Sequence, residues 1–189
     1  MENKEKRKAY RTDLSDHEWA LIAPLIPEPK PGGRPPQPTR REIVNAIFYL
    51  TRTGIGWREL PHALPNWSTV YQYYWRWSKT ELWQNVLERL NETERLAQGR
   101  NVRPSAGSLA SQSVKTTEQA SAEPRGYEVA KATKGRKRHI LVDTLGLLLL
   151  VSVTSASVSD EAGARGLLSL AWWQKPCKGL GLLWADSAY

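Results

Sequence analysis

The densest run of basic residues in the chain lies at 131–139 and reads KATKGRKRH. It leads into the apolar segment ILVD, whose composition is typical of a β-strand, so its cations should be held at a fixed place in the fold. Cations held in this way can neutralise DNA phosphates and set affinity without reading sequence. The alternative is a solvated charged face with no ligand. The candidate phosphate ligands are Lys134, Arg136, Lys137 and Arg138.

Aspartates beside apolar runs form a second group of candidate functional residues. Asp186 directly follows the short apolar strand predicted at 181–185, where a carboxylate can point into a cleft at the edge of a sheet. On residue type alone, a turn residue or a helix cap is the alternative. The same reasoning assigns Asp143 to a hairpin turn and Asp160 to the N-cap of a helix.

A third candidate is the helix predicted at Thr69–Ser78, which reads TVYQYYWRWS and has Ser68 as its cap. Gln72 and Arg76 lie four residues apart on one face, where they could reach phosphates or base edges. The aromatic residues run round too much of this helix for one buried stripe, so some should face a partner or another domain. The alternative is a helical bundle in which all of these rings are core. The aromatic residues are Tyr71, Tyr73, Tyr74, Trp75 and Trp77.

The elements that carry the third candidate are helices in the first half of the chain. Capping boxes at Ser15-x-x-Glu18 and Thr39-x-x-Glu42 predict two helix starts. Pro27 and Gly54 predict the corresponding ends. Between these helices lies a proline-rich loop, and two further elements follow. The predicted loop, turn and last helix span 27–38, 57–60 and about 80–96.

The second half of the chain changes to short β-rich runs separated by Gly, Ser and Pro. Strands at Arg138–Asp143 and Leu147–Thr154 should pair as a hairpin, because Gly146 suits the positive φ of the turn. Another strand is predicted at Gly107–Val114, and a helix at Asp160–Trp172 has acidic residues in its first turn. The order of strand, hairpin, helix and strand predicts a mixed α/β domain.

Composition limits the class of protein. The 189 residues suit one ordinary domain or two small ones, and the formal net charge of +8 favours an anionic partner. No secretory signal is apparent, and the longest apolar stretch, 140–153, is too short to span a membrane, so we expect a cytoplasmic protein. The single cysteine, Cys177, excludes an intramolecular disulfide and a cysteine-based zinc site.

Together these patterns predict an α+β protein with three regions. We expect a basic N-terminal tail at 1–13, a helical, helix-turn-helix-like DNA-binding domain at 14–98, and a mixed α/β domain at 99–189.

Several segments resemble bacterial insertion-sequence transposases. Leu14–Leu90, with WRELP at 57–61 and NWSTVYQYYWRW at 66–77, is similar to their N-terminal domain. The run KGRKRHILVDTLGLL at 134–148 is highly specific for the first part of their catalytic domain. The resemblance covers nearly the whole chain. Shorter similar segments are SQSVKTTE at 111–118, RGY at 125–127 and WADSAY at 184–189.

The resemblance implies a ribonuclease H-like fold with a DDE active site, in which three carboxylates hold two Mg²⁺ or Mn²⁺ ions that activate water or a 3′-hydroxyl. The first aspartate of the family falls on Ala110. The second falls on Asp186, which is therefore the implied catalytic and metal-binding residue. The glutamate would follow Tyr189, so the resemblance implies a truncated transposase whose metal ions are not productively bound.

The resemblance also implies double-stranded DNA of the element's terminal repeats as partner, and no membrane. The leading hypothesis is a DNA-binding transposase fragment without strand-cleaving activity. One alternative is a catalytically dead regulator of the parent element. Another is half of a split transposase, completed in trans by a C-terminal part encoded downstream. A basic helical interaction module with no DNA affinity is the last. A second copy of the chain, in a homo-oligomer, is a further candidate partner.

Overall fold

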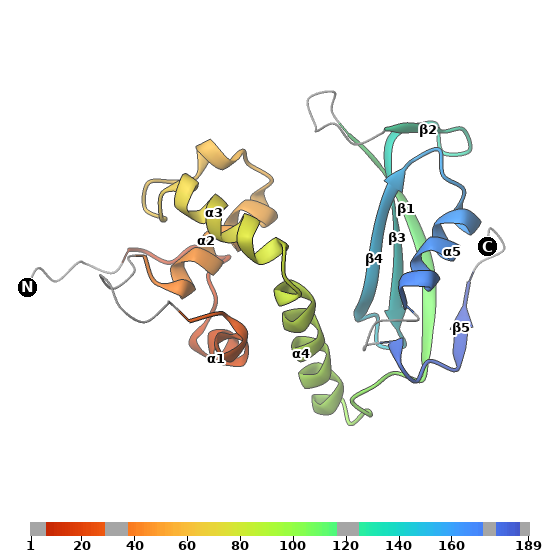
Figure 1. Cartoon of the computed structure of the whole chain (residues 1–189), viewed down its shortest axis with the longest axis horizontal. Coiled ribbons are helices and arrows are strands. Elements are labelled where there is room, and N and C mark those ends of the chain that lie inside the picture. Colours follow the sequence, from red (N-terminus) through yellow and green to blue (C-terminus); the bar gives the residue numbers. More distant parts are fainter. Residues whose placement is uncertain (1–6, 29–37, 117–124, 172–176, 186–189) are drawn as a thin grey trace, which may run out of the picture. The chain divides into compact units, whose positions relative to one another are not determined.

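The computed structural model describes residues 7–28, 38–116, 125–171 and 177–185. The chain forms two compact units that divide between Arg89 and Leu90, the first helical and the second built on a β-sheet (Figure 1). The fold class is therefore α+β, as the sequence predicted.

Unit 1 contains the helices of the first half. Helix α1 ends at Ile22, before Pro27, and a 3₁₀ turn continues it; a second 3₁₀ turn lies at the position predicted for the turn after Gly54. Helix α4 crosses the division between the units. The bounds are α1 Asp16–Ile22, η1 Ala23–Leu25, α2 Arg40–Thr53, η2 Trp57–Glu59, α3 Trp67–Ser78 and α4 Leu82–Ala97.

The helix caps agree with the sequence in part. The capping box of Ser15 and Glu18 is present in both directions, and Gly54 ends α2 with φ 70°. The second capping box is only half formed, because the Glu42 carboxylate accepts hydrogen bonds from Arg7 and Asn45 instead of the backbone at Thr39. Helix α3 starts two residues earlier than predicted, since the side chain of its N-cap, Asn66, accepts from the backbone N–H of Ser68.

The segment before α1 is part of unit 1. The sequence assigned 1–13 to a basic tail, whereas the structure holds its described part, from Arg7 on, against α2. The Arg7 guanidinium bridges Asp13 and Glu42 at 2.7 and 2.8 Å, and the Tyr10 ring lies 4.8 Å from that of Tyr49. These contacts, together with a core around Ile43, fix the segment in place.

Among the residues that the structure describes, unit 2 contains the end of α4, a five-stranded sheet and helix α5. Strand β3 pairs antiparallel with β1 on one edge and with β2 and β4 on the other, and β5 pairs parallel with β1. The hairpin of β3 and β4 is confirmed, with Gly146 at φ 80° in its turn. The bounds are β1 Ala106–Lys115, β2 Gly126–Glu128, β3 Thr133–Asp143, β4 Leu148–Ser155, α5 Asp160–Ala171 and β5 Leu182–Trp184.

Helix α5 covers one face of this sheet (Figure 1). Leu141 of β3, Leu149 of β4 and Leu167 of α5 are fully buried between helix and sheet. Side chains alternate between the faces of a strand, so every second residue of β3 joins this core and the residues between lie on the open face. No helix within the described ranges is long and apolar enough to cross a membrane.

The last turns of α4 belong to unit 2, whereas the sequence predicted a boundary at 98. Arg95 is buried and forms an ion pair with Asp143, and its Nε donates to the Asn101 carbonyl at 2.7 Å. Asn91 donates to the Leu148 carbonyl at 2.7 Å. These polar bonds attach the end of α4 to the β3–β4 turn, which explains why the division between the units falls inside this helix and not after it.

Candidate nucleic-acid interface

Helix α3 presents an exposed polar and aromatic face. Val70 and Trp77 are buried in the core of unit 1, while Gln72 and Arg76 are exposed on the other side. Trp75 is 56% exposed beside them, so the aromatic residues of this helix divide between core and surface as the sequence predicted. The face therefore offers a guanidinium, an amide and an indole to a partner.

The side chains of this face are held by ring contacts. The Tyr71 ring lies 5.1 Å from that of Trp57 in η2. The Arg76 guanidinium carbon lies 5.5 Å from the centroid of the Tyr73 ring, and Lys79 Nζ lies 5.4 Å from that of Trp75. Such cation–π contacts orient the cations along the helix surface without neutralising their charge.

The pleat of β3 divides the candidate phosphate ligands of the basic run between the two faces of the sheet. Lys134 and Arg138 are exposed and Arg136 is half-buried, all on the open face of the sheet. Arg138 pairs across the sheet with Gln112 on one side and with the exposed Val153 on the other. The open face thus combines two exposed cations with apolar neighbours.

Lys137 lies on the opposite face and cannot serve as predicted. Its side chain is 4% exposed, and its Nζ lies 3.0 Å from Glu128 and 2.9 Å from Asp160. Burial tends to lower the pKa of Lys137, but its bonds to Asp160 and Glu128 outweigh this effect and raise it. The ammonium is therefore neutralised inside unit 2 and is not available to a DNA phosphate.

The carboxylates around Lys137 are structural. Asp160 is not the N-cap of α5: the hydroxyl of Ser159 accepts from the backbone N–H of Ala162, and Asp160 turns to Lys137. Burial tends to raise the pKa of Asp160, but hydrogen bonds from Lys137 and Ser111, together with the charges of Lys137 and Lys131, outweigh this effect and lower the pKa. The pKa of Glu128 is lowered, chiefly by a hydrogen bond from Ser113. The sequence did not identify Glu128 as a partner of Lys137. The available signal was that the alternating pattern of β3 assigns Lys137 to the buried face, where an ammonium needs a carboxylate.

The residues that the resemblance places at a metal site are described only in part. Ala110 lies in the middle of β1, exposed, opposite Ile140 of β3. Asp143 lies at the far end of the β1–β3 strand pair, opposite Gly107. As predicted, it belongs to the hairpin turn, where its carboxylate accepts from two backbone N–H groups. Asp186 lies outside the described residues. The last described pair of β1 and β5 is Ser108 with Trp184.

This donor set does not fit a pair of divalent ions. Hard cations need oxygen ligands, and the methyl group of Ala110 offers none. No group of three or more His, Cys, Asp or Glu side chains within the described ranges could hold a metal ion. Position 110 therefore lacks the chemistry that the resemblance would require there.

Two family models match the chain. The one described as "Putative transposase of IS4/5 family" matches residues 14–87, and "Transposase DDE domain" matches residues 103–189. The first match covers α1 to α3 and the second covers the sheet of unit 2. No solved structure matches the chain.

Two curated bacterial proteins are similar to part of the chain. "Uncharacterized protein y4sN" of Sinorhizobium fredii is 33% identical over 64 residues, which are 34% of this chain and 51% of that protein. The "Insertion element IS402 uncharacterized 16.2 kDa protein" of Burkholderia cepacia is 36% identical over 86 residues, 42% of this chain and 55% of that protein. The chain thus spans about half the length of the curated relatives it matches.

Proposed function

Since the chain belongs to the DDE transposases of bacterial insertion sequences, and its second unit has their ribonuclease H-like fold, we propose that it binds duplex DNA at the ends of its element. The exposed face of α3 carries this proposal. Gln72 and Arg76 project from one side of a helix whose other side is anchored in the core. A helix anchored in this way can enter the major groove, where an amide and a guanidinium read base edges.

In this proposal α2 and α3 act as a helix-turn-helix unit, with η2 in the turn and α3 as the recognition helix. Trp75 and Tyr71 flank the polar pair and contact sugar or thymine methyl groups. The exposed cations of the open sheet face, Lys134 and Arg138, bind phosphates without sequence preference. Duplex DNA is the partner, and the cytoplasm, where a bacterial chromosome lies, is the location.

Fluorescence anisotropy of the full chain on a labelled duplex carrying the element's end tests this role. Arg76→Ala should cost about 1–3 kcal/mol on that duplex if Arg76 reads a base, and much less on a duplex of scrambled sequence. Arg165→Ala removes an exposed arginine of α5 and is the matched control. Equal binding of wild type and Arg76→Ala on both duplexes at several salt concentrations would exclude α3 from the interface.

We further propose that this chain binds DNA without cutting it. Two-metal catalysis needs anionic ligands around both ions, and position 110 provides an alanine where the family has its first aspartate. The readout is nicking or joining of a plasmid carrying the element's ends, with Mg²⁺ or Mn²⁺ and purified protein. No product is expected from the wild type or from Asp186→Ala. Cleavage that is lost in Asp186→Ala would contradict the proposal.

A further inference from the structure

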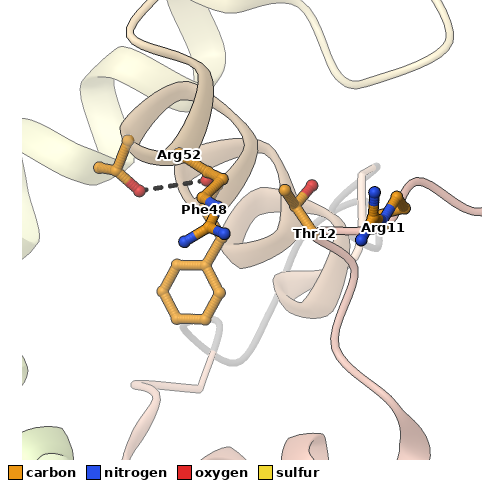
Figure 2. Close-up of a pocket in the computed structure, with 5 residues that line it drawn as sticks. Arg11, Thr12, Phe48 and Arg52 are labelled. Carbon is orange, nitrogen blue, oxygen red and sulfur yellow. Dashed lines mark hydrogen bonds between the residues drawn. The ribbon is translucent and has the colours of Figure 1, made fainter.

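A hollow on the surface of unit 1 lies between the segment before α1 and the C-terminal half of α2 (Figure 2). Figure 2 shows Arg11 and Thr12 on one side and Phe48 and Arg52 on the other. We call it the Arg11–Arg52 hollow. Its lining residues are Arg11, Thr12, Phe48, Thr51 and Arg52.

The segment that carries Arg11 and Thr12 is fixed against α2. The backbone N–H of Asp13 donates to the Tyr10 carbonyl at 3.0 Å and closes a turn around the two residues. On its far side, the backbone N–H of Leu14 donates to Asn45 Oδ1 of α2 at 3.0 Å. The position of the segment relative to α2 is therefore fixed in the free protein, before any ligand binds.

The positive charge of the hollow is not compensated. No carboxylate lines it, and Arg11 and Arg52 are exposed without an ion pair to any described carboxylate. The nearest acid in sequence, Asp13, is already bound to Arg7. Two guanidinium groups at one hollow without a counter-charge favour an anion, and their forked N–H groups suit phosphate oxygens.

Thr12, one of the residues that line the hollow, has an unused hydroxyl. Thr12 Oγ1 is buried and has no hydrogen-bond partner within the described ranges, which is unfavourable unless a ligand accepts its proton. The Thr51 hydroxyl, by contrast, donates to the backbone carbonyl of Phe48 at 3.1 Å (Figure 2). Thr12 is thus the hydroxyl that has a proton to donate to an oxygen ligand.

We propose that the Arg11–Arg52 hollow is a phosphate-binding site and that it takes a backbone phosphate of the bound DNA. The two guanidinium groups and the Thr12 hydroxyl bind the phosphate oxygens, and the Phe48 ring packs against the adjoining sugar. The assignment to DNA rests on the proposed function, whereas the phosphate chemistry follows from the residues of the hollow.

The salt dependence of DNA binding by the full chain tests the two arginines. Each lost phosphate contact should lower the slope of log affinity against log salt by about 0.9, so Arg11→Gln with Arg52→Gln should lower it by about 1.8. The control is Arg100→Gln with Arg165→Gln, which removes the same charge from exposed positions of unit 2. An equal slope in the wild type and the hollow variant would overturn the proposal.

Thr12→Val separates ligand binding from folding, because valine keeps the shape and removes the hydroxyl. Since the free protein leaves this hydroxyl unpaired, the melting temperature should stay the same or rise. DNA affinity at low salt should fall about tenfold, as expected for a hydrogen bond to a charged acceptor. A higher melting temperature with unchanged DNA affinity would overturn the role of Thr12.

Inorganic phosphate distinguishes DNA from a small phosphate ligand. If millimolar phosphate raises the melting temperature of the wild type but not of the hollow variant, while both bind DNA equally, the assignment to DNA is overturned. Failure of the wild type to bind any duplex would contradict the proposed function itself. DNA binding by the wild type that the hollow variants retain in full would overturn this inference alone.

Discussion

Gly163 of α5 lies directly over the imidazole of His139 in β3. A Cβ at position 163 would lie 1.9 Å from His139 Cε1, closer than any real contact. Helix and sheet therefore approach each other here only because residue 163 has no side chain. His139 is 1% exposed, and its Nε2 lies 2.9 Å from the Thr154 hydroxyl of β4.

Gly163→Ala should therefore destabilise unit 2 by about 1–3 kcal/mol, the usual cost of overpacking a core. Hydrogen exchange of the β3 amides measures this effect in unit 2 alone. Gly166→Ala is the matched control on the same helix, because nothing lies within 4 Å of a Cβ there. Its replacement should stabilise the helix by about 0.5–1 kcal/mol. Equal exchange in the two variants would contradict the close approach.

The stability of unit 2 should fall as the pH decreases below about 6.5. Burial lowers the pKa of His139 below its usual value of 6.5, so the unfolded chain takes up a proton that the folded chain resists. Stability is then full above 6.5 and is lost as the pH falls toward the lowered pKa. A second loss should follow below 4.5, where Glu128, whose pKa is also lowered, becomes protonated in the unfolded chain first.

Urea denaturation from pH 8 to pH 4 measures this dependence. His139→Gln removes the first titration and should flatten the curve between about pH 6.5 and the onset of the second loss. A slope that persists unchanged in His139→Gln would assign the effect to other groups.

Asp143→Asn should destabilise unit 2 by about 3–5 kcal/mol, because it leaves the guanidinium of Arg95 buried without its counter-charge. Asparagine keeps an oxygen for the backbone N–H groups of Leu145 and Leu147, so the turn itself should survive. Glu161→Gln breaks the exposed pair with Arg165 and should cost less than about 1 kcal/mol. Similar urea midpoints for the two variants would argue against a buried ion pair.

Removing cations from the two faces of β3 should have different effects on DNA binding and on stability. Lys134→Gln with Arg138→Gln should lower the salt slope of DNA binding by about 0.9 per contact and leave stability unchanged. Lys137→Met should leave the slope unchanged and cost about 3–5 kcal/mol, because Glu128 and Asp160 lose their shared cation. A lower slope with intact stability in Lys137→Met would mean that its ammonium reaches DNA.

Much of the fold could be predicted because its signals are local. The capping box of Ser15 and the hairpin glycine Gly146 depend on residues a few positions apart, and both are confirmed. The partners of Lys137 could not be predicted, since Glu128 and Asp160 come to it from β2 and α5 only after the chain folds. The anchoring of Arg7 to Glu42 escaped the sequence for the same reason.

The candidate site likewise has parts that the sequence predicted and parts that it could not. Exposure of Gln72 and Arg76 follows from helical periodicity, which a sequence displays directly. The basic run of β3 was treated as one block, although a strand sends successive residues to opposite sides. The Arg11–Arg52 hollow joins two segments separated along the chain, and no motif marks it.

Because successive residues of β3 alternate between the two faces of the sheet, the pairing register of this strand cannot shift without disrupting the core. A shift of one residue would exchange its two sides at once. Arg136 and Arg138 would then enter the space beneath α5, where a single ammonium now balances two carboxylates. The imidazole and Leu141 would move into water. An insertion or deletion of one residue within β3 is thus equivalent to several simultaneous core substitutions.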